Sequence, residues 1–139
     1  MKKVFSCITA ALALACASCG NKNNIYPVSG QVTYKGSPAS GATVFFFRQG
    51  GDSMNDHMIM GIVQEDGSLE LVCGSLGKGV PPGDYDVLIE WKSVSGHSKG
   101  QPQHSPDRLK GRYADPKQPR FHVTIKAEHN DLAPFNLSE

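Results

Sequence analysis

The residues of this chain best suited to covalent chemistry are cysteines near its start. Residues 14–20 read Leu-Ala-Cys-Ala-Ser-Cys-Gly, which places Cys16 and Cys19 in one short segment. A cysteine sulfur is a strong nucleophile once it is deprotonated. The small side chains of Ala17 and Ser18 suit a peptidase that admits only small residues before its cleavage point. The pattern therefore predicts cleavage before Cys19 and modification of its thiol.

This segment resembles a lipobox, the bacterial motif of an aliphatic residue, two small residues and a cysteine. The resemblance implies that Cys19 becomes a lipid-modified N-terminus. The first position departs from the motif, because Cys16 stands where Leu is usual. Cys16 is itself a rival site, although Leu14 is bulkier than the residue normally found there. An unlipidated secretory protein, cut after Ala17 or Ser18, is the remaining alternative.

The segment before Cys19 has the features of a secretory signal peptide. Lys2 and Lys3 give a positive start, and residues 4–17 are uncharged and rich in Ala and Leu. This run is shorter than the ~20 residues that a membrane-spanning helix needs, and small residues follow it as a cleavage site requires. A helix of the folded domain would instead alternate polar and apolar positions, which this run does not.

The predicted organisation is a signal peptide over residues 1–18, a lipidated tether over 19–26 and a folded domain over 27–139. We expect acyl chains to hold the mature protein to the bacterial cell envelope, in the outer membrane or on the periplasmic face. Without residues 1–18, 12 of the 14 basic residues remain against 13 acidic ones. This near neutrality argues against nucleic acid as a partner, because nucleic acid requires a basic face.

Cys73 is the cysteine that the lipidation scheme leaves without a role. Cleavage before Cys19 removes Cys7 and Cys16, so that Cys73 has no disulfide partner in the mature chain. Cleavage before Cys16 would leave Cys19 free to pair with it. Exported domains normally use cysteines in pairs, and we interpret Cys73 as a small buried hydrophobic residue at the end of a strand.

The spacing of turn residues in the folded domain is typical of an all-β protein. Glycine and proline divide it into short runs rich in Val, Ile, Phe, Thr and Tyr, and Asp66-Gly67 is typical of a tight hairpin. Residues 84–91 alternate, with Tyr85, Val87, Ile89 and Trp91 on one face. We predict a seven-stranded antiparallel β-sandwich of the immunoglobulin or transthyretin type, with strands within residues 28–34, 42–48, 57–64, 68–73, 84–91, 121–126 and 132–137. Residues 92–120 form the longest irregular stretch, with a helix start signal at Ser105-Pro106-Asp107.

Several of these strand and turn features occur together in a known family. They are Val28 to Tyr34 followed by Gly36-Ser37-Pro38, Gly41 to Val44, Asp66 to Leu69, and Pro82-Gly83-Asp84-Tyr85. Residues 28–92 thereby resemble the carboxypeptidase regulatory-like domain, a transthyretin-like seven-stranded sandwich. In carboxypeptidases this domain accompanies a separate zinc catalytic domain, so the resemblance implies a stand-alone structural or binding module here.

Three consecutive aromatic residues are candidates for a partner surface. Phe45, Phe46 and Phe47 cannot all face one core, because neighbouring strand residues point in opposite directions. Either the 92–120 segment with Tyr113 covers the outward ring or rings, or they form an exposed apolar patch. Trp91 and Tyr113 are further candidate partner residues, since a carbohydrate-binding module needs an exposed aromatic ring.

The sequence contains no convincing catalytic or metal site. His97, His104 and Asp107 lie in the long irregular stretch, but zinc ligands normally occur in closer pairs on a fixed scaffold. We predict no cofactor and no enzyme activity. The predicted function is a structural or protein-binding module on the envelope. A carbohydrate-binding module and an enzyme built on residues 92–120 are the alternatives, and the enzyme requires His97, His104 and Asp107 to converge in a cleft.

Overall fold

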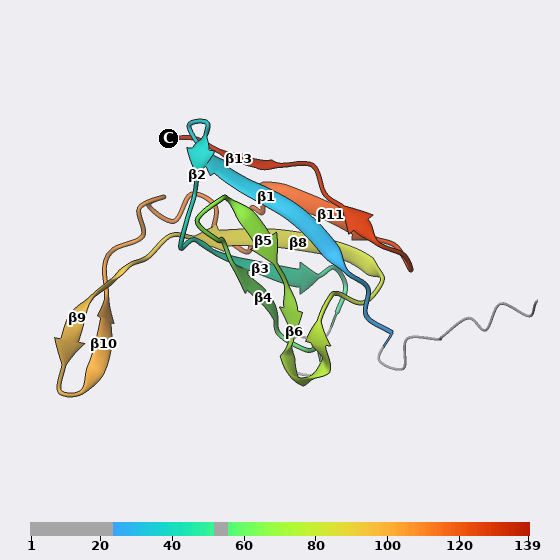
Figure 1. The fold of residues 1–139 in the computed structure, drawn as a ribbon, viewed down its shortest axis with the longest axis horizontal. Coiled ribbons are helices and arrows are strands. Elements are labelled where there is room, and N and C mark those ends of the chain that lie inside the picture. Colours follow the sequence, from blue (N-terminus) through green and yellow to red (C-terminus); the bar gives the residue numbers. More distant parts are fainter. Residues whose placement is uncertain (1–23, 52–55) are drawn as a thin grey trace, which may run out of the picture.

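Short runs of β-branched and aromatic residues between glycine-rich turns form two facing sheets (Figure 1). The computed structural model describes residues 24–51 and 56–139. The predicted all-β sandwich is confirmed. The predicted signal peptide, Cys16 and Cys19 lie outside the described residues. Among the described residues, no helix has the length and apolar character needed to cross a membrane.

The larger sheet has six strands, and every neighbouring pair in it is antiparallel. Its order is β11 (Phe121–Ile125), β8 (Gly83–Glu90), β3 (Thr43–Arg48), β4 (Ile59–Ile62), β6 (Val72–Cys73) and β7 (Gly77–Lys78). A single 3-10 turn, η1 (Gly74–Leu76), joins the last two strands.

The second sheet is built around β1 (Val28–Tyr34). β2 (Ser37–Pro38) and β5 (Ser68–Glu70) pair with β1 in antiparallel fashion, whereas β12 (Asn130–Asp131) and β13 (Phe135–Leu137) pair with it in parallel. The prediction of a purely antiparallel sandwich is wrong in this detail. A parallel pair requires a long connection, and the chain from β1 to β13 supplies one.

The core lies between the sheets and is filled by alternating strand residues. In β8, Tyr85, Val87 and Ile89 are fully buried as predicted, and Trp91 continues this stripe beyond the strand end. Phe121 of β11, an edge strand of the larger sheet, packs edge-on against Phe135 of β13 in the second sheet, with ring centroids 5.1 Å apart. Cys73 is also buried in this core, and burial raises the pKa of its thiol. It behaves as the small hydrophobic residue that we predicted.

The predicted strand over residues 68–73 is two strands that belong to different sheets. β5 pairs with β1, whereas β6 pairs with β4, and the buried side chain of Leu71 lies between them. Where the chain passes from β5 to β6, the carbonyl oxygen of Glu70 lies against Gly61 of β4. A Cβ atom added at residue 61 would collide with this oxygen.

The predicted irregular stretch contains a hairpin that the sequence analysis missed. β9 (Val94–Ser98) and β10 (Gln101–His104) are joined by Lys99-Gly100, and both turn residues have positive φ. Every residue of this hairpin is exposed, and it extends away from the sandwich in Figure 1. The helix signal at residues 105–107 leads only to turns.

The close approach at Gly61 predicts a specific weakness of the fold. Gly61→Ala should lower the free energy of unfolding by about 1–3 kcal/mol, because the new methyl group forces β4 away from the Glu70 carbonyl at the end of β5. Gly30→Ala is the matched control, since a Cβ there meets its nearest heavy atom, Leu132 Cβ, at 3.8 Å. Urea denaturation of both variants tests this, and equal stability of the two would contradict this close approach.

Candidate functional site

The three consecutive phenylalanines divide between the two faces of the larger sheet. Phe46 points into the core, where it is 3% exposed and packs on Tyr85 with ring centroids 5.8 Å apart. Phe45 and Phe47 point to the opposite face, with ring centroids 6.4 Å apart, and Phe47 is 50% exposed. Tyr113 does not cover them, because its ring stacks on Phe121 instead.

The outward phenylalanines belong to a larger apolar surface. Pairing of β6, β4, β3 and β8 places Val72, Met60, Phe45 and Leu88 in one row across these strands. Met58 and Ile62 lie on the same face by strand alternation and are 66% and 54% exposed. We call this surface the outer apolar face; it consists of Phe45, Phe47, Met58, Met60, Ile62, Val72 and Leu88. Leu88, at the β8 edge of this surface, is already covered, since it is only 6% exposed.

The same side of the sheet becomes polar beyond β3. Asp86 of β8 accepts hydrogen bonds from Gln49 Nε2 at 2.6 Å and lies 2.6 Å from His122 Nδ1 on β11. Asp84 accepts a hydrogen bond of 2.6 Å from the Thr124 hydroxyl. The outer apolar face therefore has a polar border along β8 and β11.

Trp91 and Tyr113 are not exposed partner residues, in contrast to the prediction. Trp91 is 8% exposed, its indole N–H donates to the Ser40 carbonyl at 2.9 Å, and the Arg108 guanidinium lies 4.0 Å from its ring centroid. Tyr113 is 6% exposed, and its hydroxyl accepts a hydrogen bond from the Ser138 amide at 3.0 Å. Both rings fill the end of the core, so neither offers a platform for a sugar.

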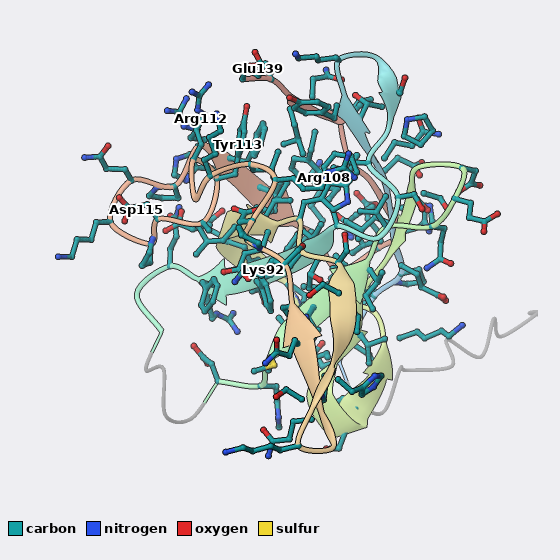
Figure 2. All side chains as sticks on the ribbon, turned by 90° about the vertical axis from the view of Figure 1, so that its left-hand side faces the viewer. Lys92, Arg108, Arg112, Tyr113, Asp115 and Glu139 are labelled. Atoms are coloured by element: carbon teal, nitrogen blue, oxygen red, sulfur yellow. The ribbon has the colours of Figure 1, made fainter. Side chains whose placement is uncertain are left out.

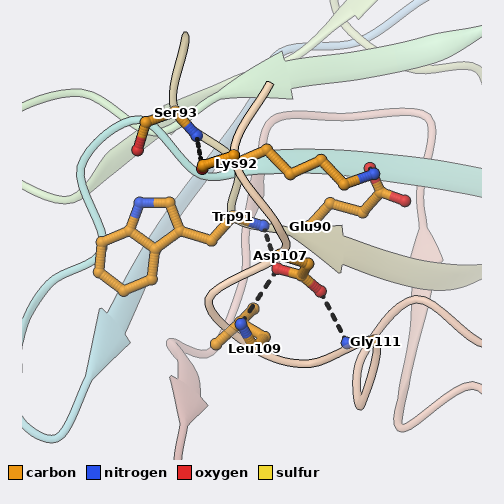
Figure 3. A network of polar contacts seen from close by, with 8 residues as sticks. Glu90, Trp91, Lys92, Ser93, Asp107, Leu109 and Gly111 are labelled. Atoms are coloured by element: carbon orange, nitrogen blue, oxygen red, sulfur yellow. Dashed lines mark hydrogen bonds and ion pairs between the residues drawn. The ribbon is translucent and has the colours of Figure 1, made fainter. Parts of the chain in front are cut away.

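The carboxylate of Asp107 organises the segment that follows the hairpin. Its Oδ1 accepts hydrogen bonds from the backbone amides of Trp91 at 2.8 Å and Leu109 at 3.1 Å, and its Oδ2 accepts one from Gly111 at 2.8 Å (Figure 3). The side chain thus caps a turn and ties it to the end of β8. Lys110 and Gly111, both at positive φ, stop this turn from continuing as a helix.

The three residues of the enzyme alternative do not form a reactive cluster. The carboxylate oxygens of Asp107 already accept three backbone hydrogen bonds. His97 and His104 lie on the exposed hairpin. Within residues 24–51 and 56–139, no group of three or more His, Cys, Asp or Glu side chains is arranged to hold a metal ion.

Three cations within residues 108–112 are candidate site residues that no sequence pattern above indicated. Arg108, Lys110 and Arg112 alternate with Leu109 and Gly111. These three residues line a hollow of about 230 Å³ together with Tyr34, Ser138 and Glu139. The alternation of basic residues around the Lys110-Gly111 turn is the sequence signal that could have indicated this cluster of cations.

Comparison with known proteins assigns this chain to no family. No family model and no curated protein matches it. Similar solved structures include a 9R-lipoxygenase from Cyanothece (TM-score 0.46, 11% identity, 98% of this chain and 18% of the lipoxygenase). They also include DUF3823 family proteins from Bacteroides ovatus (0.41, 14%, 79% and 43%) and Parabacteroides merdae (0.37, 15%, 80% and 43%). The chain spans less than half the length of each.

The Asp107 network predicts a large effect of a single carboxylate. Asp107→Ala should lower the free energy of unfolding by about 2–3 kcal/mol, because it leaves three backbone donors without their charged acceptor. Asp115→Ala is the control, since Asp115 is exposed and its carboxylate accepts a hydrogen bond from one amide, that of Lys117; its effect should stay below about 1 kcal/mol. Urea denaturation measures both, and similar losses would refute the role of Asp107.

Proposed function

We propose that this chain is an envelope lipoprotein, anchored through Cys19, whose β-sandwich is a non-enzymatic module that binds another protein. The domain is proposed to be of the carboxypeptidase regulatory-like, transthyretin-like type. The observation that supports binding is the outer apolar face, where exposed and half-buried apolar side chains of three neighbouring strands, β3, β4 and β6, lie side by side.

The composition of this surface supports a partner rather than chance exposure. The large hydrophobic side chains classed as exposed in the described residues are Phe47, Met58, Ile62, Val72 and Val94, and all but Val94 lie on the outer apolar face. Single exposed hydrophobic residues are common on proteins, whereas a contiguous patch marks an interaction site. Burying one such side chain completely contributes about 1.5–3 kcal/mol, so a few of them provide substantial binding energy.

The partner that fits is a protein with an apolar surface and a basic edge. Asp84 borders the outer apolar face and is bonded by the neutral Thr124 hydroxyl, whereas Asp86 lies 2.6 Å from His122 and Glu90 is paired with Lys92 at 2.8 Å. A cation on the partner would therefore find a carboxylate beside the apolar contact. The carbohydrate alternative has no exposed ring at Trp91 or Tyr113 to support it.

A photo-crosslinking residue at position 47 tests the protein-binding proposal. We expect irradiation of cells producing the full chain to yield an adduct of one defined mass. The same residue at position 94 is the control, because Val94 is 59% exposed but lies on the hairpin strand β9. No adduct, an adduct equally strong from both positions, or an adduct only between two copies of this chain would defeat the proposal.

Lipidation has a separate test. The mature protein should carry acyl mass on an N-terminal Cys19, and Cys19→Ser should move the protein from the membrane to the soluble fraction, because two or more acyl chains are needed for stable anchoring. Cys16→Ser should leave the protein in the membrane fraction. Acyl mass on Cys16, or an unmodified N-terminus at Ser18, would contradict the choice of Cys19.

A further inference from the structure

Among the described residues, the cations of residues 108–120 form no ion pair with an acidic side chain. The segment from Asp107 to Arg120 contains five basic residues and two acidic ones. Asp107 and Asp115 both accept backbone hydrogen bonds within their own turns. In the described part of the chain, no carboxylate forms an ion pair with any of these five cations. The segment therefore carries a net positive charge on a protein that is close to neutral, and the exposed Glu139 carboxylate interacts electrostatically with one of its cations, Lys110, without forming an ion pair.

Three of these cations surround one hollow. Arg108, Lys110 and Arg112 line a hollow of about 230 Å³, together with Tyr34, Leu109, Ser138 and Glu139. Figure 2 shows Arg108, Arg112, Tyr113 and Glu139 on the same side of the molecule. The remaining two cations, Lys117 and Arg120, are not part of its lining.

The backbone that carries these cations is fixed before any ligand arrives. Asp107 holds the amides of Leu109 and Gly111, and the Leu109 side chain is buried. The Arg108 guanidinium lies over Trp91, and the buried Tyr113 is tied to Ser138. A preorganised site loses less conformational entropy on binding than a mobile loop does.

The chemistry of the lining points to a phosphate group. Arginine presents a planar fork of donors that matches phosphate oxygens, and two arginines with a lysine suit a doubly charged anion. The hollow is smaller than the ~300–1,000 Å³ of pockets that enclose drug-sized molecules, so it admits a phosphate with a small attached group rather than an oligosaccharide. Glu139 lies at the same hollow and is held by Lys35 at 2.7 Å.

Glu139 adds selectivity within this class. The hydrogen bond from Lys35 holds the pKa of the Glu139 carboxyl below its ordinary value, so Glu139 remains an acceptor. Beside a phosphate, a carboxylate is favourable only where the ligand also offers a hydroxyl or ammonium group. We propose that this hollow, lined by Arg108, Lys110, Arg112 and Glu139, is a binding site for the phosphomonoester of a small polyhydroxylated molecule.

The position of the hollow favours a ligand away from the anchoring membrane. The tether enters the fold before Val28 at one end of β1, and Tyr34 at the other end lines the hollow. Seven strand residues separate these ends by roughly 20 Å. Figure 1 shows the C-terminus at the far end of β1 from its start. The site is therefore expected to take a soluble phosphomonoester rather than a headgroup of the anchoring leaflet.

Calorimetric titration of the detergent-solubilised full chain tests the site. Glucose 6-phosphate should bind with a dissociation constant of about 1 mM or tighter, and glucose should not bind. Arg112→Gln should weaken glucose 6-phosphate binding by about tenfold or more, whereas Lys117→Gln, in the same segment but outside the lining, should leave it unchanged. Circular dichroism and urea denaturation establish that both variants are folded.

Each other outcome overturns a stated part of the proposal. Absent binding, or equal affinity in Arg112→Gln and Lys117→Gln, rejects the site. Inorganic phosphate binding as tightly as glucose 6-phosphate rejects the selectivity assigned to Glu139. Binding only to phosphatidylcholine vesicles that contain phosphatidic acid rejects the soluble source. A Phe47→Ser variant should bind glucose 6-phosphate normally, so failure here and failure of the protein-binding proposal are distinguishable.

Discussion

The pairing of β3 with β8 fixes both the core and the surfaces of this protein. Phe46 is registered opposite Val87, and Phe45 is registered opposite Leu88. Because side chains alternate along a strand, a slip of one residue would expose Phe46 and bury Phe45 and Phe47 instead. The burial of Tyr85, Val87 and Ile89 on the inner face resists such a slip. The outer apolar face is therefore a direct consequence of the same register that fills the core.

This pairing also determines where residues 105–120 are attached. β8 ends beside Trp91, whose amide donates to Asp107 and whose indole donates to Ser40. The Ile89 amide donates to the Tyr113 carbonyl at 2.9 Å, which brings the segment back against the strand. The hydrogen bonds from Trp91 to Asp107 and from Ile89 to Tyr113 thus fix this long connection, with its basic residues, against the end of β8. Long loops in compact domains are usually functional or disordered, and the hydrogen bonds here favour the first case.

The sequence predicted those parts of the fold in which alternation is unambiguous. Residues 84–91 and 121–126 each turn one set of alternate side chains toward the core, with Leu88 as an additional buried residue on the other face, and their strands were placed within a residue or two. The β9–β10 hairpin gave no such signal, because all its side chains are exposed. Its turn is Lys99-Gly100, and the same dipeptide turns the chain at Lys35-Gly36 and Lys110-Gly111, with both residues at positive φ each time.

The candidate site was predictable only in part, for a similar reason. Alternation required Phe45 and Phe47 to face away from Phe46, but it could not decide whether another segment would cover them. The burial of Trp91 and Tyr113 could not be predicted, because it depends on contacts with Asp107 and Ser138, which are distant from them in sequence. The convergence of Arg108 and Glu139 likewise depends on the parallel pairing of β13 with β1, which no local pattern indicates.

The distribution of side chains within one sheet face argues that its apolar part is selected. Outward positions on β8 and β11 include Asp84, Asp86, His122 and Thr124, so this fold tolerates polar residues on that face. The outward positions of β3, β4 and β6 face the same solvent but carry Phe47, Ile62 and Val72. Packing of the core makes no demand on these positions, since they point away from it. An apolar centre with a polar border is the pattern of a protein interface, and the proposed binding of another protein rests on this arrangement.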